Sequence, residues 1–219
     1  MRWLNVLLLC VAAVYGEQKK MRLPELGLEP LDPFTIGNLV LDKKKNIGSP
    51  VDIDLSWENA VITGIKSAVL TSAKADWDNN LISFEASLSE PVDIKGKYHM
   101  DGIVLILPIK GDGDFDCKLE GFKAHIKVHG QPQEIDGKKY MIVDRLVFTF
   151  DVKHMTVEYK NLFSGDRNLG DTMNSFLNEN WRDIVDELKP AIEAALSSHF
   201  QPLAEKVFNS VPIDEIALP

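Results

Sequence analysis

Residues 168–210 read NLGDTMNSFLNENWRDIVDELKPAIEAALSSHFQPLAEKVFNS, and this stretch decides the fold. Its large apolar residues recur at steps of three and four, the period of one face of an α-helix. They are Leu169, Met173, Phe176, Leu177, Trp181, Ile184, Leu188, Ile192, Leu196, Phe200, Leu203 and Val207. The opposite face should be solvated and contains Asp171, Asn178, Glu179, Arg182, Asp186, Lys189 and Glu193. The pattern predicts one very long amphipathic helix.

A helix of this length needs an equally long cover for its apolar face. About 40 residues extend roughly 60 Å, whereas globular helices usually have about 11 to 12 residues. We expect Asn168 to cap the start and Pro212 to end the helix. Pro190 and Pro202 lie inside the pattern and each removes a backbone donor, so the helix should bend. The prolines and the lack of a strict heptad argue against a coiled coil.

Upstream of the helix, apolar and polar residues alternate with the period of two that is typical of β-strands. The alternation or an apolar run is found at 35–41, 51–57, 60–72, 82–88, 92–100, 103–107, 115–119, 124–128, 146–150 and 155–159. We expect a turn at 110–114, a bulge at Asp101–Gly102 and a hairpin at Asp136–Gly137. Since no helical segment interrupts the strands, they should form one antiparallel sheet with consecutive pairing.

Strands of this length must twist and coil, and glycines at 96, 102 and 121 would allow the sheet to curl. A long curled sheet can bury the apolar face of a long helix by wrapping around it. The sequence therefore predicts an α+β fold, with a long, strongly curved antiparallel sheet wrapped around one long C-terminal helix.

The N-terminus has the features of a secretory signal peptide. Arg2 precedes an apolar run from Trp3 to Val14, and this run is too short to span a bilayer. We expect removal of residues 1–16 and a single domain over 17–219 that is secreted and extracellular. The mature chain would carry 23 basic and 33 acidic residues, a net charge of about −10. This charge argues against nucleic acid and anionic membranes as partners.

Cys117 would be the only cysteine of the mature chain, because Cys10 leaves with the signal peptide. An internal disulfide is then impossible. Two alternatives stay open for Cys117. It is either a small buried hydrophobe on a strand or a reactive or intermolecular thiol.

The sequence contains no motif for a hydrolase, a zinc peptidase or a phosphate-binding loop. His125 and His129 lie four residues apart on an expected strand, roughly 13 Å, which is too far to bind one metal ion. Residues 112–117 resemble the start of a calcium loop, but a cysteine stands where glycine is required. We therefore expect no enzymatic activity, no cofactor and no metal.

Three segments resemble signatures of the insect juvenile hormone binding and takeout-like proteins. Near the N-terminus lies Leu23-Pro-Glu-Leu-Gly-Leu-Glu-Pro-Leu-Asp-Pro. Before and within the helix lie Asn161-Leu-Phe-Ser-Gly-Asp-Arg-Asn-Leu-Gly, 176–181 and 187–190. Near the C-terminus lies Phe208-Asn-Ser-Val-Pro-Ile-Asp-Glu215. Together the segments span roughly 23–216 and follow the order of the family, which has circadian and feeding-related members.

The resemblance implies the tubular lipid-binding architecture, in which a curved sheet rolled around a helix leaves an apolar tunnel for one small hydrophobic ligand. Family members normally carry an N-terminal helix and a disulfide-forming cysteine pair ahead of the first signature. Here only residues 17–22 lie between the expected signal peptide and that signature. The resemblance therefore implies a shortened chain or a missing exon, and we expect one end of the tube to be less well closed.

Apolar residues that face the helix either pack the core or line the tunnel. Aromatic, methionine and aliphatic positions are our candidates for the lining, and tyrosine and tryptophan could also orient a ligand carbonyl or epoxide. The candidates are Phe84, Leu88, Tyr98, Met100, Phe115, Ile126, Val128, Phe148, Met155, Tyr159, Trp181 and Leu188.

The sequence thus predicts a secreted, monomeric carrier that binds one small hydrophobic ligand without a covalent step. The ligand would be a juvenile-hormone-like terpenoid, a fatty acid or a related lipid. A receptor or another extracellular protein is a further expected partner, and stable membrane insertion is not expected. The alternative is an extracellular protein-interaction module of the same fold whose tunnel is filled or degenerate.

Overall fold

The computed structural model describes residues 32–41, 50–209 and 212–213. The strands of this part are β1 (Phe34–Leu41), β2 (Val51–Thr63), β3 (Ala68–Asp76), β4 (Leu81–Leu88), β5 (Val92–Val104), β6 (Leu107–Glu120), β7 (Lys123–Ile135), β8 (Lys138–Asp151) and β9 (His154–Tyr159). The helices are the single turns η3 (Ile65–Ser67) and η4 (Phe163–Gly165), then α2 (Arg167–Glu179) and α3 (Trp181–Phe208). The expected signal peptide and nearly all of the first family signature lie outside the described residues.

The α+β class is confirmed, but the strands form two antiparallel sheets and not one. The first sheet has the order β1-β2-β5-β6-β9, and the second has the order β3-β4-β7-β8. The pairs β2 with β5, β4 with β7 and β6 with β9 are not consecutive in sequence. The expectation of consecutive pairing was wrong because the chain crosses between the sheets after β2, β4, β6 and β8.

Close backbone contacts hold these crossings together. The backbone N–H of Leu88 donates to the carbonyl of Phe122 at 3.0 Å, which joins the crossings after β4 and β6. Gly64, in the crossing after β2, has a φ of 89°, and a Cβ there would overlap the carbonyl oxygen of Pro91. Only glycine fits this close approach of two chain segments.

Of the predicted hairpin, turn and bulge, the hairpin is right and the other two are wrong. Asp136 and Gly137, with φ of 50° and 75°, form the two-residue turn of the β7–β8 hairpin. The expected turn at 110–114 lies within β6, and the β5–β6 turn falls at 105–106. The pairing of β5 with both neighbours is continuous at Gly102, so the bulge expected there is wrong.

Glycines inside β6 explain the misplaced turn. A Cβ at Gly111 would overlap the hydroxyl of Tyr98, and a Cβ at Gly113 would overlap the carbonyl oxygen of Lys160. Both glycines therefore allow a close approach within a strand. In sequence, such a pair cannot be told from the glycines of a turn.

The segment expected to be one helix is two helices separated by Asn180. This residue has φ −106° and ψ 20°, outside the regular helical range, and its side-chain amide donates to the carbonyl of Phe176 at 2.8 Å. The side chain thus satisfies a carbonyl in the last turn of α2. The apolar period continues across the break, so periodicity did not reveal it.

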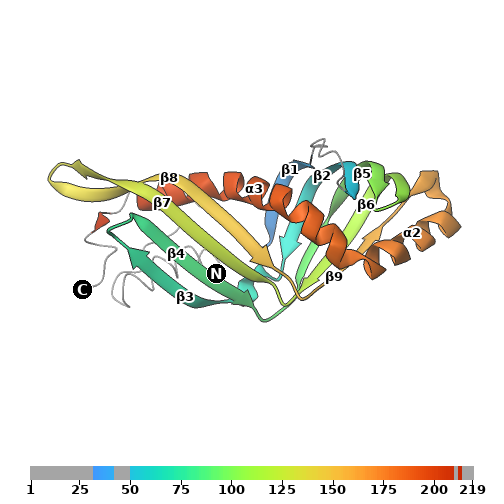
Figure 1. Cartoon of the computed structure of the whole chain (residues 1–219), viewed down its shortest axis with the longest axis horizontal. Coiled ribbons are helices and arrows are strands. Elements are labelled where there is room, and N and C mark those ends of the chain that lie inside the picture. Colours follow the sequence, from blue (N-terminus) through green and yellow to red (C-terminus); the bar gives the residue numbers. More distant parts are fainter. Residues whose placement is uncertain (1–31, 42–49, 210–211, 214–219) are drawn as a thin grey trace.

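The helix ends and interior agree with expectation only in part. Asp166 caps α2, because its carboxylate accepts from the backbone N–H of Leu169 at 3.1 Å. The expected cap, Asn168, lies two residues further on, within the first turn of the helix. α3 ends at Phe208 and runs as one helix through Pro190 and Pro202. It bends along its length, as expected (Figure 1).

Figure 1 shows α3 lying lengthwise across both sheets, with α2 continuing beside the five-stranded sheet. α3 packs mainly against β8 and also contacts β9, β1 and β2. Buried residues of both sheets and both helices form one hydrophobic core. Across the residues that the structure describes, no helix has the length and apolar character needed to cross a membrane.

Candidate functional site

A cavity of about 540 Å³ lies between the helices and the two sheets. Every strand except β3 contributes to its lining, together with α2 and α3. The α3 residues of the lining extend from Ile184 to Val207, which corresponds to roughly 35 Å along the helix axis. The volume falls within the range of about 300 to 1,000 Å³ that is usual for small-molecule sites.

The cavity lining is apolar except at its two ends. Trp57, Cys117 and Tyr159 form what we call the inner end, near α2. Pro33, Thr35, His199 and Lys206 form what we call the mouth; all four line the cavity and are also exposed to solvent. The mouth joins the start of β1 to the last third of α3, because the ring of His199 lies 5.2 Å from that of Phe34.

Aromatic rings pack against one another at the inner end. Trp57 stacks on Phe115 with 4.8 Å between ring centroids, and Tyr159 meets Tyr98 edge to face at 4.6 Å. The Tyr98 hydroxyl donates to the backbone carbonyl of Lys160 at 2.8 Å, away from the lining. The indole N–H of Trp57 is buried and makes no hydrogen bond with the described residues.

Burial disfavours negative charge at the inner end. Desolvation, with a smaller effect of the Asp93 charge, raises the pKa of the Cys117 thiol to about 12. Desolvation, with a smaller effect of nearby Cys117, also raises the pKa of the Tyr159 hydroxyl. Cys117 is a buried free thiol on β6, which agrees with the first of its two alternatives and leaves it without the thiolate character of a reactive cysteine.

Two asparagines on α2 bind the free edge of β9. Asn174 accepts from the backbone N–H of Tyr159 at 2.9 Å and donates to its carbonyl at 3.0 Å. Asn178 does the same for Val157, at 2.7 and 2.8 Å. Asn178 was expected to be solvated, but it supplies the two hydrogen bonds that a neighbouring strand would otherwise provide.

Side chains on α3 and just beyond it bind the free edge of β8. Glu193 accepts from the backbone N–H of Phe150 at 3.1 Å, and Ser197 accepts from that of Phe148 at 2.9 Å. Asn209 accepts from that of Val143 at 3.0 Å. Glu193 was also expected to be solvated. The helices therefore cover both the apolar faces and the polar edges of the sheets.

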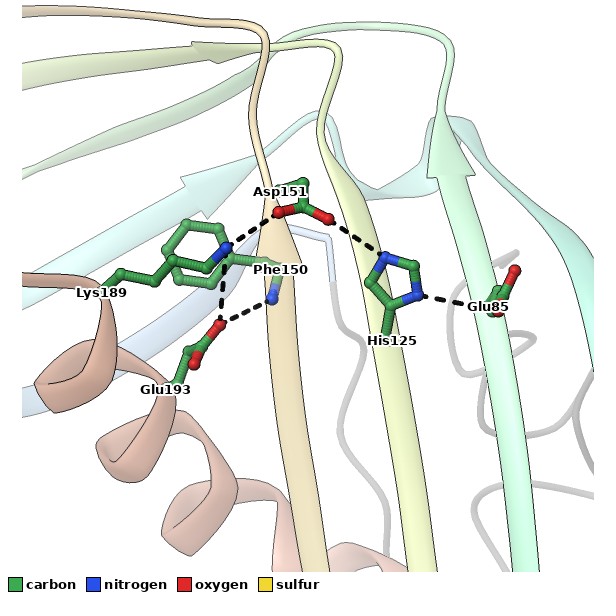
Figure 2. Close-up of polar contacts among 6 residues, drawn as sticks. All are labelled: Glu85, His125, Phe150, Asp151, Lys189 and Glu193. Atoms are coloured by element: carbon green, nitrogen blue, oxygen red, sulfur yellow. Dashed lines mark hydrogen bonds and ion pairs between the residues drawn. The ribbon is translucent and has the colours of Figure 1, made fainter. Parts of the chain in front are cut away.

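A charged network surrounds the Glu193 contact (Figure 2). The ammonium of Lys189 lies 2.8 Å from one oxygen of Asp151 and 4.0 Å from Glu193. The other Asp151 oxygen lies 3.3 Å from Nε2 of His125, whose Nδ1 is 3.9 Å from Glu85. The hydrogen bond to Lys189 lowers the pKa of Asp151, and the same bond raises the pKa of Lys189. The network extends from α3 across β8 and β7 to β4.

The sequence profile of the haemolymph juvenile hormone binding protein family matches residues 17–218 of the chain. The chain belongs to this family. The match covers both sheets and both helices, and hence the whole lining of the cavity.

Individual relatives agree with the family. The chain is 22% identical to the circadian clock-controlled protein daywake of Drosophila melanogaster over 213 residues, which cover 95% of this chain and 82% of daywake. It is 23% identical to a Schistocerca gregaria protein provisionally named as beta-carotene-binding, over 88% of this chain and 75% of that protein. The crystal structure of Epiphyas postvittana Takeout 1 is similar with a TM-score of 0.76 and 31% identity, over 90% of this chain and 88% of Takeout 1.

The structure places seven of the twelve residues that the sequence suggested as tunnel lining around the cavity. These are Leu88, Met100, Ile126, Phe148, Met155, Tyr159 and Leu188. The other five lie outside the lining. Phe84, Tyr98, Phe115 and Val128 are buried in the core, and Trp181 packs edge to face on His154 at the start of α3. Strand alternation identified the first four as inward-facing, and the helical period did so for Trp181, but inward-facing residues also fill the solid parts of the core.

Sequence reasoning missed much of the lining. The missed residues include Phe34, Ile36, Ile53, Leu55, Trp57, Ile184, Ile192, Leu196, His199, Phe200 and Lys206. The alternation at 51–57 and the helical period of α3 could have identified several of them. His199 and Lys206 gave no such signal, because polar residues on a helix are normally solvated.

The acidic residues that resembled a calcium loop lie in β6. Asp116 forms ion pairs with Lys95 at 2.6 Å and Lys160 at 3.6 Å, and these lower its pKa. In the described ranges, no group of three or more histidine, cysteine or acidic side chains is arranged to hold a metal ion.

Proposed function

We propose that the protein is a secreted carrier that holds one small hydrophobic ligand non-covalently in the cavity beneath α3. The observation that carries the proposal is the apolar space of about 540 Å³ along the helix. Empty cavities with apolar walls stay dry and take up apolar molecules. A juvenile-hormone-like terpenoid, a fatty acid or a related lipid has the elongated shape that the lining suggests, and the names of the family and of its beta-carotene-binding relative support this class.

Burial of the ligand would supply most of the binding energy. An elongated ligand that loses about 300 Å² of apolar surface gains roughly 7 to 8 kcal/mol before the costs of association. We therefore expect dissociation constants in the micromolar range or somewhat below.

The carrier would perform no covalent chemistry on its ligand. Cys117 and Tyr159 are the potential nucleophiles at the inner end of the cavity, and burial keeps both in their neutral forms. The family match is to binding proteins, in line with this proposal. Secretion rests on the signal-like residues 1–16, and the monomeric state and a receptor partner remain parts of the proposal.

The size of the cavity weighs against the alternative of an interaction module with a filled tunnel. A filled tunnel would leave no space larger than a few water molecules. An interaction module could still use the acidic surface, but it would purify without a bound lipid. Mass spectrometry of an organic extract of the natively purified protein distinguishes the two, because a carrier should bring about one lipid per chain.

Displacement of a neutral naphthylamine dye tests the carrier function in solution. We expect saturable one-to-one binding of the dye and its displacement by long-chain lipids. Leu196→Trp adds bulk from α3 into the cavity and should reduce dye binding at least tenfold. Ala194→Trp is the matched control, because Ala194 lies on the exposed side of the same helix and outside the lining.

The proposal fails if the wild-type protein binds neither dye nor lipid. It also fails if Leu196→Trp and Ala194→Trp, both shown to be folded by circular dichroism, bind the dye as the wild type does. In that case the dye would bind outside the cavity.

A further inference from the structure

The mouth contains a lysine at the edge of the cavity. Lys206 is the lysine of the cavity lining, and its side chain is exposed. Within the described residues, Lys206 has no carboxylate partner, and the same holds for other exposed lysines such as Lys97 and Lys127. Lys206 differs from those two because it lines the cavity. The adjacent acid, Glu205, accepts a hydrogen bond from Gln201 at 3.0 Å.

The mouth also contains a neutral hydrogen-bonding group, the ring of His199. His199 lies two helical turns before Lys206 and hence on the same face of α3. Partial burial lowers the pKa of His199, so its ring is mainly neutral at physiological pH and can donate one N–H.

We propose that the ligand is an amphiphile with an acidic head group, whose tail fills the cavity and whose carboxylate lies at the mouth beside Lys206. This inference rests on the proposed carrier function and selects one class among its ligands. The contact joins a cation without a partner in the described chain to an anion that stays partly hydrated, because the mouth is open to solvent. Such charge-assisted contacts are stronger than those between neutral groups.

The electrostatics of the cavity determine the direction in which such a ligand would lie. Cys117 and Tyr159 show that the inner end resists negative charge, since burial raises the pKa of both groups. A carboxylate placed there would meet the same desolvation cost. The hydrocarbon tail therefore points to the inner end and the head group lies at the mouth. The lining residues of α3 extend about 35 Å along the helix axis, which sets the upper limit for the distance between the two ends.

Lys206 also has a purely structural explanation, which the experiment must separate from ligand binding. It stands in the last turn of α3, where the helix dipole attracts a positive charge. In that role, its replacement would change stability but would not change the preference for one head group over another.

Competition between two ligands with the same tail isolates the head group. Palmitate and methyl palmitate would each be titrated against the neutral naphthylamine dye, with wild-type protein and Lys206→Gln. We expect Lys206→Gln to weaken palmitate binding about three- to tenfold and to leave methyl palmitate unchanged. Raising the salt concentration should weaken palmitate binding to the wild type and have less effect on the variant.

Arg182→Gln is the matched control, because it removes one positive charge from α3 at a site outside the lining. It should leave the ratio of palmitate to methyl palmitate affinity unchanged. The inference is overturned if Lys206→Gln weakens both ligands equally or neither, or if Arg182→Gln has the same effect as Lys206→Gln. In that case, binding of methyl palmitate by all three proteins would show that the carrier function stands without the head-group contact. Failure of the wild type to bind either ligand would count against the carrier function itself.

Discussion

The two helices bind the two sheet edges in the same register but with different chemistry. Residues four apart on a helix are separated by about 6.0 Å, and residues two apart on a strand by about 6.8 Å. Asn174 and Asn178 on α2 therefore match Tyr159 and Val157 on β9. In the same way, Glu193 and Ser197 on α3 match Phe150 and Phe148 on β8.

The difference lies in how completely each edge is paired. On α2, each asparagine both accepts from and donates to one strand residue, so β9 has a substitute for a neighbouring strand. On α3, the carboxylate of Glu193 and the hydroxyl of Ser197 only accept from the strand, and the Ser197 hydroxyl donates within the helix to the carbonyl of Glu193 at 2.6 Å. The carboxylate also belongs to a charged network. α2 is thus attached by neutral, two-way contacts, and α3 by one-way contacts that depend in part on charge.

This difference coincides with the division of the cavity lining. Leu177 is the residue that α2 contributes, whereas α3 contributes residues along most of its length. The firmly attached helix therefore closes the inner end, and the helix with weaker edge contacts covers the length of the cavity and the mouth.

The largest effect should come from the α2 contacts. Asn178→Ala removes both hydrogen bonds to Val157, a residue only 7% exposed, and so leaves a backbone donor and an acceptor without partners. We expect the free energy of unfolding to fall by about 2 to 3 kcal/mol. Urea denaturation measures this change. Asn168→Ala, at an exposed position of the same helix, should change it by less than about 0.5 kcal/mol. Equal values for the two variants would remove the distinction between the helices.

A smaller effect is expected on α3. Ser197→Ala removes one acceptor from the N–H of Phe148, while the Phe148 carbonyl is not involved. The free energy of unfolding should fall by about 1 kcal/mol in urea denaturation. Ser198→Ala is the control, since Ser198 is the exposed neighbour. A loss for Ser197→Ala as large as that for Asn178→Ala would show that the two edges are bound equally well.

These edge contacts were not predicted from the sequence, because a polar residue on a helix gives no sign of what it faces. Asn178 and Glu193 were assigned to the solvated face for this reason. The class of the fold was predicted, since the periods of two and 3.6 are local properties of the chain. Strand alternation does not specify which strands pair, so the division into two sheets was not accessible.

The candidate site was predicted in part for a similar reason. Alternation identifies residues that point inward, such as Met155 and Phe148, and both line the cavity. Phe84 and Val128 also point inward, but they fill the core. Whether an inward-facing residue meets a neighbour or an empty space depends on the packing of the whole molecule, which no local pattern encodes.

The smallest effect should be the pH dependence of the α3 attachment. The pKa of Asp151 is below its usual 3.8, so its contribution to stability is present above that value and is lost as the pH falls through the lowered pKa. The pKa of Lys189 is above its usual 10.5, so its contribution is present below that value and is lost as the pH rises through the raised pKa.

The contribution of this pair should therefore be constant from about pH 5 to pH 9 and decline on either side. Because the Asp151 side chain is 62% exposed, we expect less than about 1 kcal/mol. Asp151→Asn should reduce the loss of stability between about pH 6 and pH 3, as measured by urea denaturation at each pH, whereas Asp144→Asn, an exposed aspartate on the same strand, should not. An unchanged acid dependence in Asp151→Asn would mean that α3 is held by Ser197, Asn209 and apolar packing without a contribution from the charged network.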